Sequence, residues 1–139
     1  MAGINSYVLD SFALIGFLEN EKFASRVEGL LKQARKGKTV VYLHALHLGE
    51  VYYITLREQS QNMADLACAR IKSFPVRYID IIDDELLRNA GWLKANYPIS
   101  YADAFAASLA ITRNSSLLTG DPEFKKLEKK ESVSIEWLA

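Results

Sequence analysis

The chain has 139 residues, half of them apolar and 24% charged, which favours one soluble domain, residues 1–139, with a single sizeable core. Its 17 basic and 17 acidic side chains balance, so nucleic-acid binding would depend on local patches rather than on a general basic excess. The lone Cys68 excludes an internal disulfide, and the sequence shows no bilayer-spanning run and no signal peptide, so we expect a cytoplasmic protein.

Apolar periodicity in the first half of the chain predicts two strands and four helices. β-branched and aromatic runs mark the strands, whereas apolar residues at helical spacing, such as Val27, Leu30 and Leu31, mark the helices. Asp10 stands directly before the first helix, where an aspartate caps open backbone N–H groups. In chain order we expect a strand at 6–9, helices at 11–18 and 22–35, a strand at 39–43, and helices at 44–56 and 61–72.

The second half continues this alternation but contains one helix unlike the others. Between residues 104 and 112 that helix carries no charged side chain, and a helix that is apolar on all sides is usually buried at the centre of a domain. The expected elements are a strand at 76–79, helices at 83–96 and 100–113, a strand at 116–119, a short helix from 122 and an edge strand at 133–137.

Strands and helices that alternate in this way predict an α/β fold with a mostly parallel sheet between layers of helices. Such sheets bind ligands beyond the carboxyl ends of their strands. Asp10 and Asp121 each follow a predicted strand, so both belong at this edge. Glu50 and Asp103 lie in predicted helices between them.

Three of these four acids also have an ordinary structural explanation. Asp10, Asp103 and Asp121 all stand at positions that suit helix caps. Glu50 instead shares a helical face with apolar residues, so its carboxylate should be partly buried and need a partner. Four carboxylates in one pocket must offset their mutual repulsion, either through raised pKa values or through a bound divalent cation.

The motifs around these acids resemble those of the PIN-domain nucleases, and within them the VapC-type toxins of VapBC toxin–antitoxin pairs. The likeness covers nearly the whole chain and is most specific around Asp103. It implies a five-stranded sheet in the order 3-2-1-4-5, dependence on Mg²⁺ or Mn²⁺, and cleavage of RNA. The segments that carry it are residues 7–15 with Asp10, 48–51 with Glu50, 99–107 with Asp103, and 117–124 with Asp121.

On this interpretation Asp10, Glu50 and Asp103 would hold the first Mg²⁺ or Mn²⁺ ion, and Asp121 would complete the site directly or through water. The ion would activate water for attack on a phosphodiester and offset charge on the phosphate oxygens. We therefore predict a metal-dependent endoribonuclease, the toxin of a toxin–antitoxin pair. The resemblance implies RNA, an antitoxin protein and a second copy of the chain as partners, and no membrane.

Three other functions remain open. One is an RNA-processing PIN nuclease outside any toxin system, and another is a non-catalytic PIN-like module that acts through protein contacts. The third is a phosphatase or phospho-acceptor, although such enzymes usually carry a second acid close to the first, and Asp10-Ser11-Phe12 offers none.

Several other side chains invite a functional interpretation but have plainer explanations. His44 and His47 lack the further donors that zinc usually needs, so we place them at the surface or in support of the acids. Glu123 could assist the metal site, although a glutamate is common in the first turn of a helix. Possible RNA or partner contacts are Lys32, Arg35, Lys36, Lys38, Tyr52, Tyr53, Trp92, Tyr97 and Tyr101, with most of the aromatic residues expected in the core or in a dimer contact.

Overall fold

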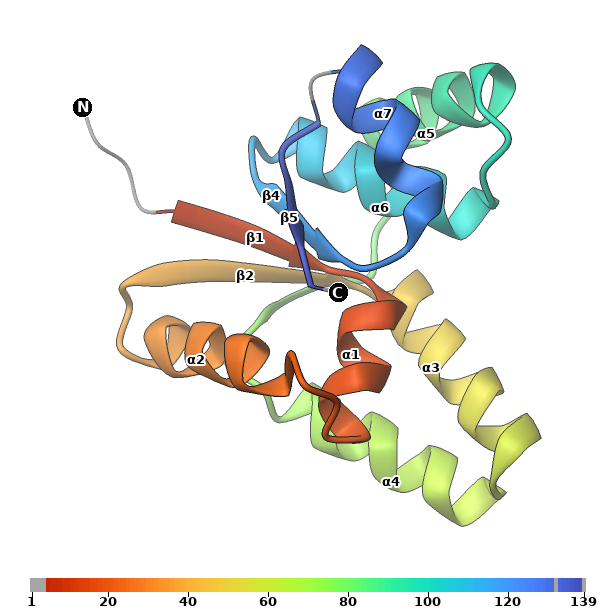
Figure 1. The fold of residues 1–139 in the computed structure, drawn as a ribbon. Helices are drawn as coiled ribbons and strands as arrows, with labels where there is room; N and C mark the ends of the chain where they lie inside the picture. The colour runs from red at the N-terminus through yellow and green to blue at the C-terminus, as the bar shows by residue number, and fades with distance from the viewer. Residues whose placement is uncertain (1–4, 132, 139) are drawn as a thin grey trace.

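The computed structural model describes residues 5–131 and 133–138 (Figure 1). Five strands form one sheet in the order β3-β2-β1-β4-β5, and every neighbouring pair in it is parallel. This is the order that the family resemblance implied, with an entirely parallel sheet in place of a mostly parallel one. The strands are β1 (Asn5–Leu9), β2 (Thr39–His44), β3 (Arg77–Ile79), β4 (Ser116–Thr119) and β5 (Ile135–Trp137).

Helices cover both faces of the sheet, which gives the three layers of an α/β/α fold. The helices of the first half lie on one face and those of the second half on the other (Figure 1). The first group is α1 (Ser11–Leu18), α2 (Ala24–Arg35), α3 (Ala45–Glu58) and α4 (Gln61–Lys72). The second is α5 (Asp84–Asn96), α6 (Tyr101–Thr112) and α7 (Lys125–Lys130), with a 3₁₀ turn η1 (Pro122–Phe124) before α7.

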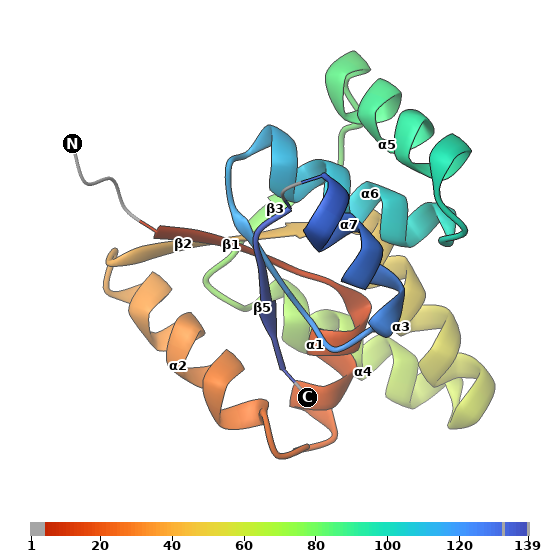
Figure 2. The same ribbon diagram turned by 45° about the horizontal axis from the view of Figure 1, so that its top comes forward.

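Each face of the sheet has its own apolar core. Successive residues of a strand point to opposite faces, so Leu9 packs with α1 to α4, whereas Val8 packs with α5 to α7. Figure 2 shows α6 between α5 and the sheet, and its residues from Asp103 to Ala110 are all buried. The prediction of a buried, uncharged helix is therefore confirmed.

Strand β1 lies at the centre and joins the two halves of the chain. Tyr7 pairs with Val41 of β2 on one side and with Ser116 of β4 on the other. Near the start of the β1–β4 pair, the hydroxyls of Ser6 and Ser115, which are 109 residues apart in sequence, lie 2.6 Å from each other. The register brings the carboxyl ends of β1, β2 and β4 to one edge of the sheet, where the candidate site lies.

Most of the expected boundaries match the observed ones. The helices predicted at 11–18 and 61–72 and the strand predicted at 116–119 have the observed bounds. The last strand is shorter than expected, since it begins at Ile135 rather than at residue 133, but it does lie at an edge of the sheet. Within the described part of the chain, no helix has both the length and the apolar character needed to cross a membrane.

Candidate active site

Two of the four predicted acids are placed by the ends of the central strands. Asp10 follows β1 and caps α1, because its Oδ1 accepts a hydrogen bond of 2.9 Å from the Ala13 amide. Asp121 follows β4 and caps η1, because its Oδ1 accepts a hydrogen bond of 2.9 Å from the Glu123 amide. Asp10 is only 2% exposed, whereas Asp121 is half-buried and lies nearer the solvent.

The other two acids are carried by helices whose N-termini reach the same edge. Asp103 lies in the first turn of α6, where its amide donates to the Ser100 hydroxyl at 3.1 Å, and its side chain is 9% exposed. Glu50 lies on α3 and is half-buried, as expected for a carboxylate on an apolar helical face. Asp10 and Asp121, by contrast, use their carboxylates both to cap a helix and to face the other acids.

The four side chains are close enough for their charges to act on one another. Asp10 is affected by the charges of Asp121 and Glu50, Glu50 by that of Asp121, and Asp103 by those of Asp121 and Asp10. Elements that are far apart in sequence thus place four carboxylates near one another. The structure brings together all four residues that the sequence singled out.

A fifth acid, Glu123, is part of this cluster. Among the described residues, carboxylate oxygens of Asp103, Asp121 and Glu123 all lie within 4.8 Å of one another, a set that does not include Asp10 or Glu50. Sequence reasoning noted that Glu123 could assist the metal site but favoured an ordinary first-turn glutamate. The available signal was its spacing, because a residue two positions after Asp121 in a tight turn can direct its side chain back to the same pocket.

Burial and mutual repulsion raise the pKa values of the deepest acids. Burial raises the pKa of Asp10 from 3.8 to about 7, although hydrogen bonds from the Thr119 hydroxyl and the Ala13 amide oppose the rise. Burial, the neighbouring Glu123 carboxyl and the charges of Asp121 and Asp10 raise the pKa of Asp103 to about 9. Burial also raises the pKa of Glu50. Without a cation, the site therefore retains protons at neutral pH.

Two hydroxyl groups support these carboxylates. Thr119, at the end of β4, is fully buried and bonds the Asp10 carboxylate. Its Oγ1 also accepts a hydrogen bond of 3.1 Å from the Asp121 amide. Ser11 bonds the Glu50 carboxylate. Both hydroxyls thus hold the acids in fixed orientations toward the pocket.

The donor set fits a hard divalent cation. Glu50 Oε1 is buried and has no hydrogen-bond partner within the described part of the chain. The salt bridges found there join Arg26 to Glu136, Lys32 to Glu28 and Arg88 to Asp84, so none of them neutralises an acid of the site. Clustered carboxylate oxygens without a basic partner are the ligands that Mg²⁺ and Mn²⁺ prefer.

Comparison with known proteins agrees with this geometry. The family model of the PIN domain matches residues 7–130. The chain belongs to the PIN-domain family. A search of curated proteins gives no match.

Solved structures similar to this PIN domain include several toxin–antitoxin proteins. VapBC2 from Rickettsia felis, bound to a DNA fragment from its promoter, is 17% identical with a TM-score of 0.76, and the match covers 96% of this chain and 99% of that one. DNA-bound VapBC from Salmonella typhimurium is 14% identical with a TM-score of 0.74, over 97% and 99% of the two chains. VapC20 from Mycobacterium tuberculosis, described as a toxin that cleaves the sarcin–ricin loop, is 21% identical with a TM-score of 0.62, over 88% and 94%. At these identities the likeness establishes the fold.

The structure narrows two expectations about side chains outside the acid cluster. His44 and His47 are 2% and 0% exposed, so neither lies at the surface of the PIN domain. The basic residues around Lys36 and Lys38 lie where α2 leads into β2, at the edge of the sheet opposite the acids (Figure 1). That cluster does not line the candidate site.

The aromatic residues considered as contacts divide into two groups. Tyr53, Trp92 and Tyr101 are about half exposed, and Tyr101 lies in the first turn of α6 beside Asp103. Tyr52 and Tyr97 are tied to acidic side chains, because their hydroxyls donate to Asp65 and Glu131. Tyr53, Trp92 and Tyr101 therefore keep exposed rings that a ligand or a partner could contact.

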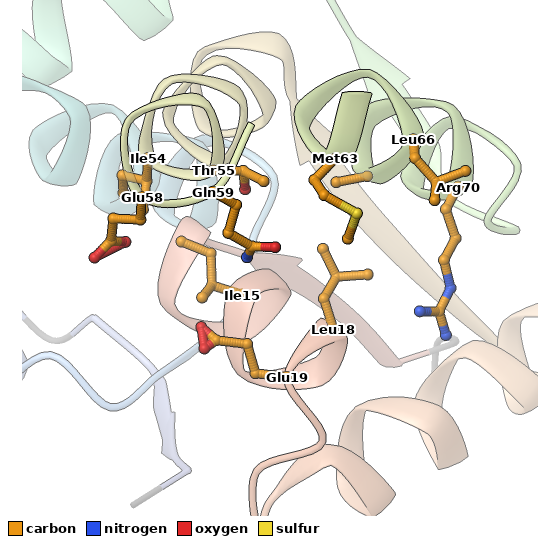
Figure 3. A pocket seen from close by; sticks show the side chains of 11 residues that line it. Ile15, Leu18, Glu19, Ile54, Thr55, Glu58, Gln59, Met63, Leu66 and Arg70 are labelled. Atoms are coloured by element: carbon orange, nitrogen blue, oxygen red, sulfur yellow. The ribbon is translucent and has the colours of Figure 1, made fainter. Parts of the chain in front are cut away.

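An apolar groove leads away from the site across α1, α3 and α4. Figure 3 shows a hollow of about 200 Å³ lined mainly by apolar side chains, with Glu19 and Glu58 toward one end and Arg70 at the other. A second hollow of about 610 Å³ shares Ile15, Glu19 and Ile54 with it and extends to Asp121. The two hollows thus adjoin, and the second one reaches Asp121. The apolar residues of the first hollow are Ile15, Leu18, Ile54, Met63, Leu66 and Ala67.

Proposed function

We propose that this PIN domain is a metal-dependent endoribonuclease in which Asp10, Glu50, Asp103 and Asp121 hold Mg²⁺ or Mn²⁺. The observation that carries the proposal is the convergence of these carboxylates at the carboxyl edge of the sheet without a basic partner among the described residues. Structural ion pairs would bring Lys or Arg into such a pocket, whereas a site for a cation leaves the oxygens free.

The side chains of the site have different parts in this function. A divalent cation bound there would activate water and offset charge on the phosphate. Asp10 and Asp103 supply the buried part of the site, and their raised pKa values mean that they release protons as a cation binds. Glu50 offers its unpartnered Oε1, and Asp121 faces the more open side, where a phosphodiester can enter.

We further propose that the chain is the toxin of a toxin–antitoxin pair and that its substrate is RNA. Solved structures of similar fold are described as VapBC complexes, and one of them as a toxin that cleaves the sarcin–ricin loop. The apolar groove that leads to Asp121 suits an amphipathic segment of an antitoxin, whose basic side chain could pair with the acids. A second copy of the chain would complete a homodimer, for which exposed Ile81 and Ile82 offer an apolar patch.

Cleavage of RNA tests the proposal directly. The purified chain should cut RNA in the presence of Mg²⁺ or Mn²⁺ and stop when a chelator is added. Asp103→Asn should lower the rate at least 100-fold, because it removes a buried ligand oxygen. Asp84→Asn serves as the matched control, because Asp84 is exposed, pairs only with Arg88 and lies on α5 outside the site. Cleavage by Asp103→Asn at the wild-type rate would refute the assignment.

The alternatives give different results in the same assays. A phosphatase would release phosphate from a small phosphomonoester and leave RNA intact. A non-catalytic module would bind a partner and show no divalent-dependent cleavage. An RNA-processing nuclease would cut RNA, but its gene would have no neighbour encoding a small protein that inhibits the cleavage.

A further inference from the structure

His47 is a fully buried residue of α3, the helix that carries Glu50, and it contacts α6, the helix that carries Asp103. It lies on α3, three residues before Glu50 and therefore on a similar face of that helix. Its Nε2 lies 2.9 Å from the backbone oxygen of Ala102 in the first turn of α6. Ala102 precedes Asp103 in the chain. One hydrogen bond therefore links the helix that carries Glu50 to the residue next to Asp103.

The geometry of this contact fixes the state of the imidazole ring. A carbonyl oxygen only accepts, so Nε2 must carry the proton and donate it. Nδ1 is buried and has no hydrogen-bond partner among the residues that the structure describes. A second proton on Nδ1 would therefore have no acceptor, and burial accordingly lowers the pKa of His47 to about 4. The ring is neutral at physiological pH and brings no positive charge close to the acids.

His44 lies next to His47 in space but bonds to other parts of the structure. Its Nδ1 accepts from the Leu46 amide at 3.1 Å, which caps α3, and its Nε2 lies 3.0 Å from the Ile81 oxygen. The two rings meet edge to face with centroids 6.3 Å apart. Of the two histidines, His47 is thus the one that bonds to the segment that carries Asp103.

We propose that His47 is a positioning residue that sets the place of Asp103 relative to Glu50, so that their carboxylates face one cation. The proposal rests on the metal-binding function assigned above. Helix α3 packs less closely against α6 than α5 does, so the hydrogen bond from His47 is one of few direct contacts between the two acid-bearing helices. The Ala102 oxygen would keep its donor within α6, but loss of the hydrogen bond from His47 would remove a link between the two helices and let the first turn of α6 move away from α3.

Three variants separate positioning from general stability. His47→Leu keeps an apolar side chain of moderate size but removes the donor. His47→Gln returns an N–H at about the same reach as Nε2. Ser108→Ala is the control, because the Ser108 hydroxyl is also fully buried on α6 and donates to the Leu86 oxygen at 3.0 Å, on the side away from the acids.

The first measurement is the dissociation constant of Mn²⁺ without RNA, obtained by calorimetry at a temperature where every variant is folded. His47→Leu should weaken binding roughly 10-fold or more, in the range found for residues that orient metal ligands. His47→Gln should recover most of this loss. Ser108→Ala should lower the melting temperature and leave the dissociation constant within about twofold of the wild type, since its bond lies outside the acid cluster.

The second measurement needs no metal. The Ala102 carbonyl and the Asp103 amide belong to one peptide group, so the ¹⁵N chemical shift of the Asp103 amide reports on the bond from His47. That shift should change in His47→Leu, return in His47→Gln and stay constant in Ser108→Ala. An unchanged shift, or Mn²⁺ binding by His47→Leu as tight as that of the wild type, would overturn the positioning role. If the wild type binds no Mn²⁺, the metal-binding function fails, and the amide shift still decides whether His47 places the Asp103 segment.

Discussion

The buried hydroxyl of Thr119 bonds the carboxylate of Asp10 from the neighbouring strand. The same oxygen accepts a hydrogen bond of 3.1 Å from the Asp121 amide. One hydroxyl thus connects the side chain of Asp10 to the backbone of Asp121. The bond from Thr119 favours the ionised form of Asp10 and opposes the rise in its pKa that burial causes. Thr119 therefore helps to keep Asp10 available as an anion.

Replacing Thr119 tests this relationship. Thr119→Val preserves the shape of the side chain but removes the hydroxyl, so the pKa of Asp10 should rise further and Mn²⁺ binding should weaken roughly 10-fold. Thr119→Ser retains the hydroxyl and should bind Mn²⁺ nearly as well as the wild type. Calorimetric titration with Mn²⁺ measures both variants, and equal affinities of the two would contradict the role of the hydroxyl.

The charge of Asp10 should matter more for function than for folding. Asp10→Asn can still cap α1, because asparagine is as good a cap as aspartate. Above pH 7 the variant avoids the cost of an ionised buried carboxyl, for which the rise in pKa from 3.8 to about 7 sets an upper limit of about 4 kcal/mol. The metal-free variant should therefore melt at a higher temperature than the wild type at pH 8, while RNA cleavage falls at least 100-fold. A lower melting temperature together with full cleavage activity would contradict this prediction.

Stability of the metal-free protein should fall as the pH rises above neutral. In the unfolded chain Asp103 loses its proton near pH 4, whereas in the fold its pKa is about 9. Between these values the folded state binds more protons, so the free energy of unfolding decreases as the pH increases. His47 has the opposite effect below about pH 6.5, because burial lowers its pKa to about 4, so the test belongs between pH 7 and 9.

Thermal unfolding without metal should accordingly show a melting temperature several degrees lower at pH 9 than at pH 7. Asp103→Asn should remove most of this dependence, and saturating Mg²⁺ should also reduce it, because the ion favours the ionised carboxyls. The same dependence of melting temperature on pH in the wild type and in Asp103→Asn over this range would show that the pKa of Asp103 is not raised.

Binding of an antitoxin should depend on the apolar groove. Leu66 is 61% exposed at the groove, so Leu66→Asp should leave the fold intact and weaken binding of the proposed antitoxin at least 10-fold. Ile111→Asp provides a control, because Ile111 is also exposed but lies at the far end of α6. If a basic side chain of the partner reaches the acids, excess Mg²⁺ should relieve the inhibition of cleavage. Equal binding by both variants would place the partner elsewhere.

A dimer should depend on the segment between β3 and α5. Ile81 and Ile82 are 70% and 43% exposed, although the bond between His44 and the Ile81 oxygen holds their backbone in place. A fixed apolar patch of this kind favours a symmetric contact with a second copy. Ile81→Asp should shift sedimentation from dimer to monomer, whereas Ile111→Asp should not. A wild-type chain that sediments only as a monomer at high concentration would rule out the contact.

The fold was largely predictable because local and global signals in this sequence agree. Asp10, Ser100 and Pro122 mark helix starts that the structure reproduces, and the uncharged run in α6 indicated its central position. The strand order followed from the family resemblance rather than from any local pattern. Periodicity shows which residues are buried but not which strands are neighbours.

The sequence pointed to four acids as the candidate site, but it did not predict the contacts that surround them. Asp10 and Asp121 were indicated by the ends of strands, and Glu50 by a charge on an apolar helical face. Asp103 was indicated by its place at the start of a buried helix and by the family resemblance around it. The contacts of His47 and Glu123 did not, because a hydrogen bond to Ala102 and a carboxyl that turns back toward Asp103 depend on distances between helices. Such distances are set by packing, which one sequence does not display.

The pairing of β1 with β4 has a consequence for the newly made protein. The central strand is synthesised first, yet one of its two neighbours, carrying Thr119 and leading to Asp121, follows more than a hundred residues later, as the 109-residue separation of Ser6 and Ser115 shows. A nascent chain on the ribosome therefore holds three of the acids before it can build the edge that makes them a site. For the nuclease proposed above, this order of synthesis delays activity until the whole catalytic region has been translated.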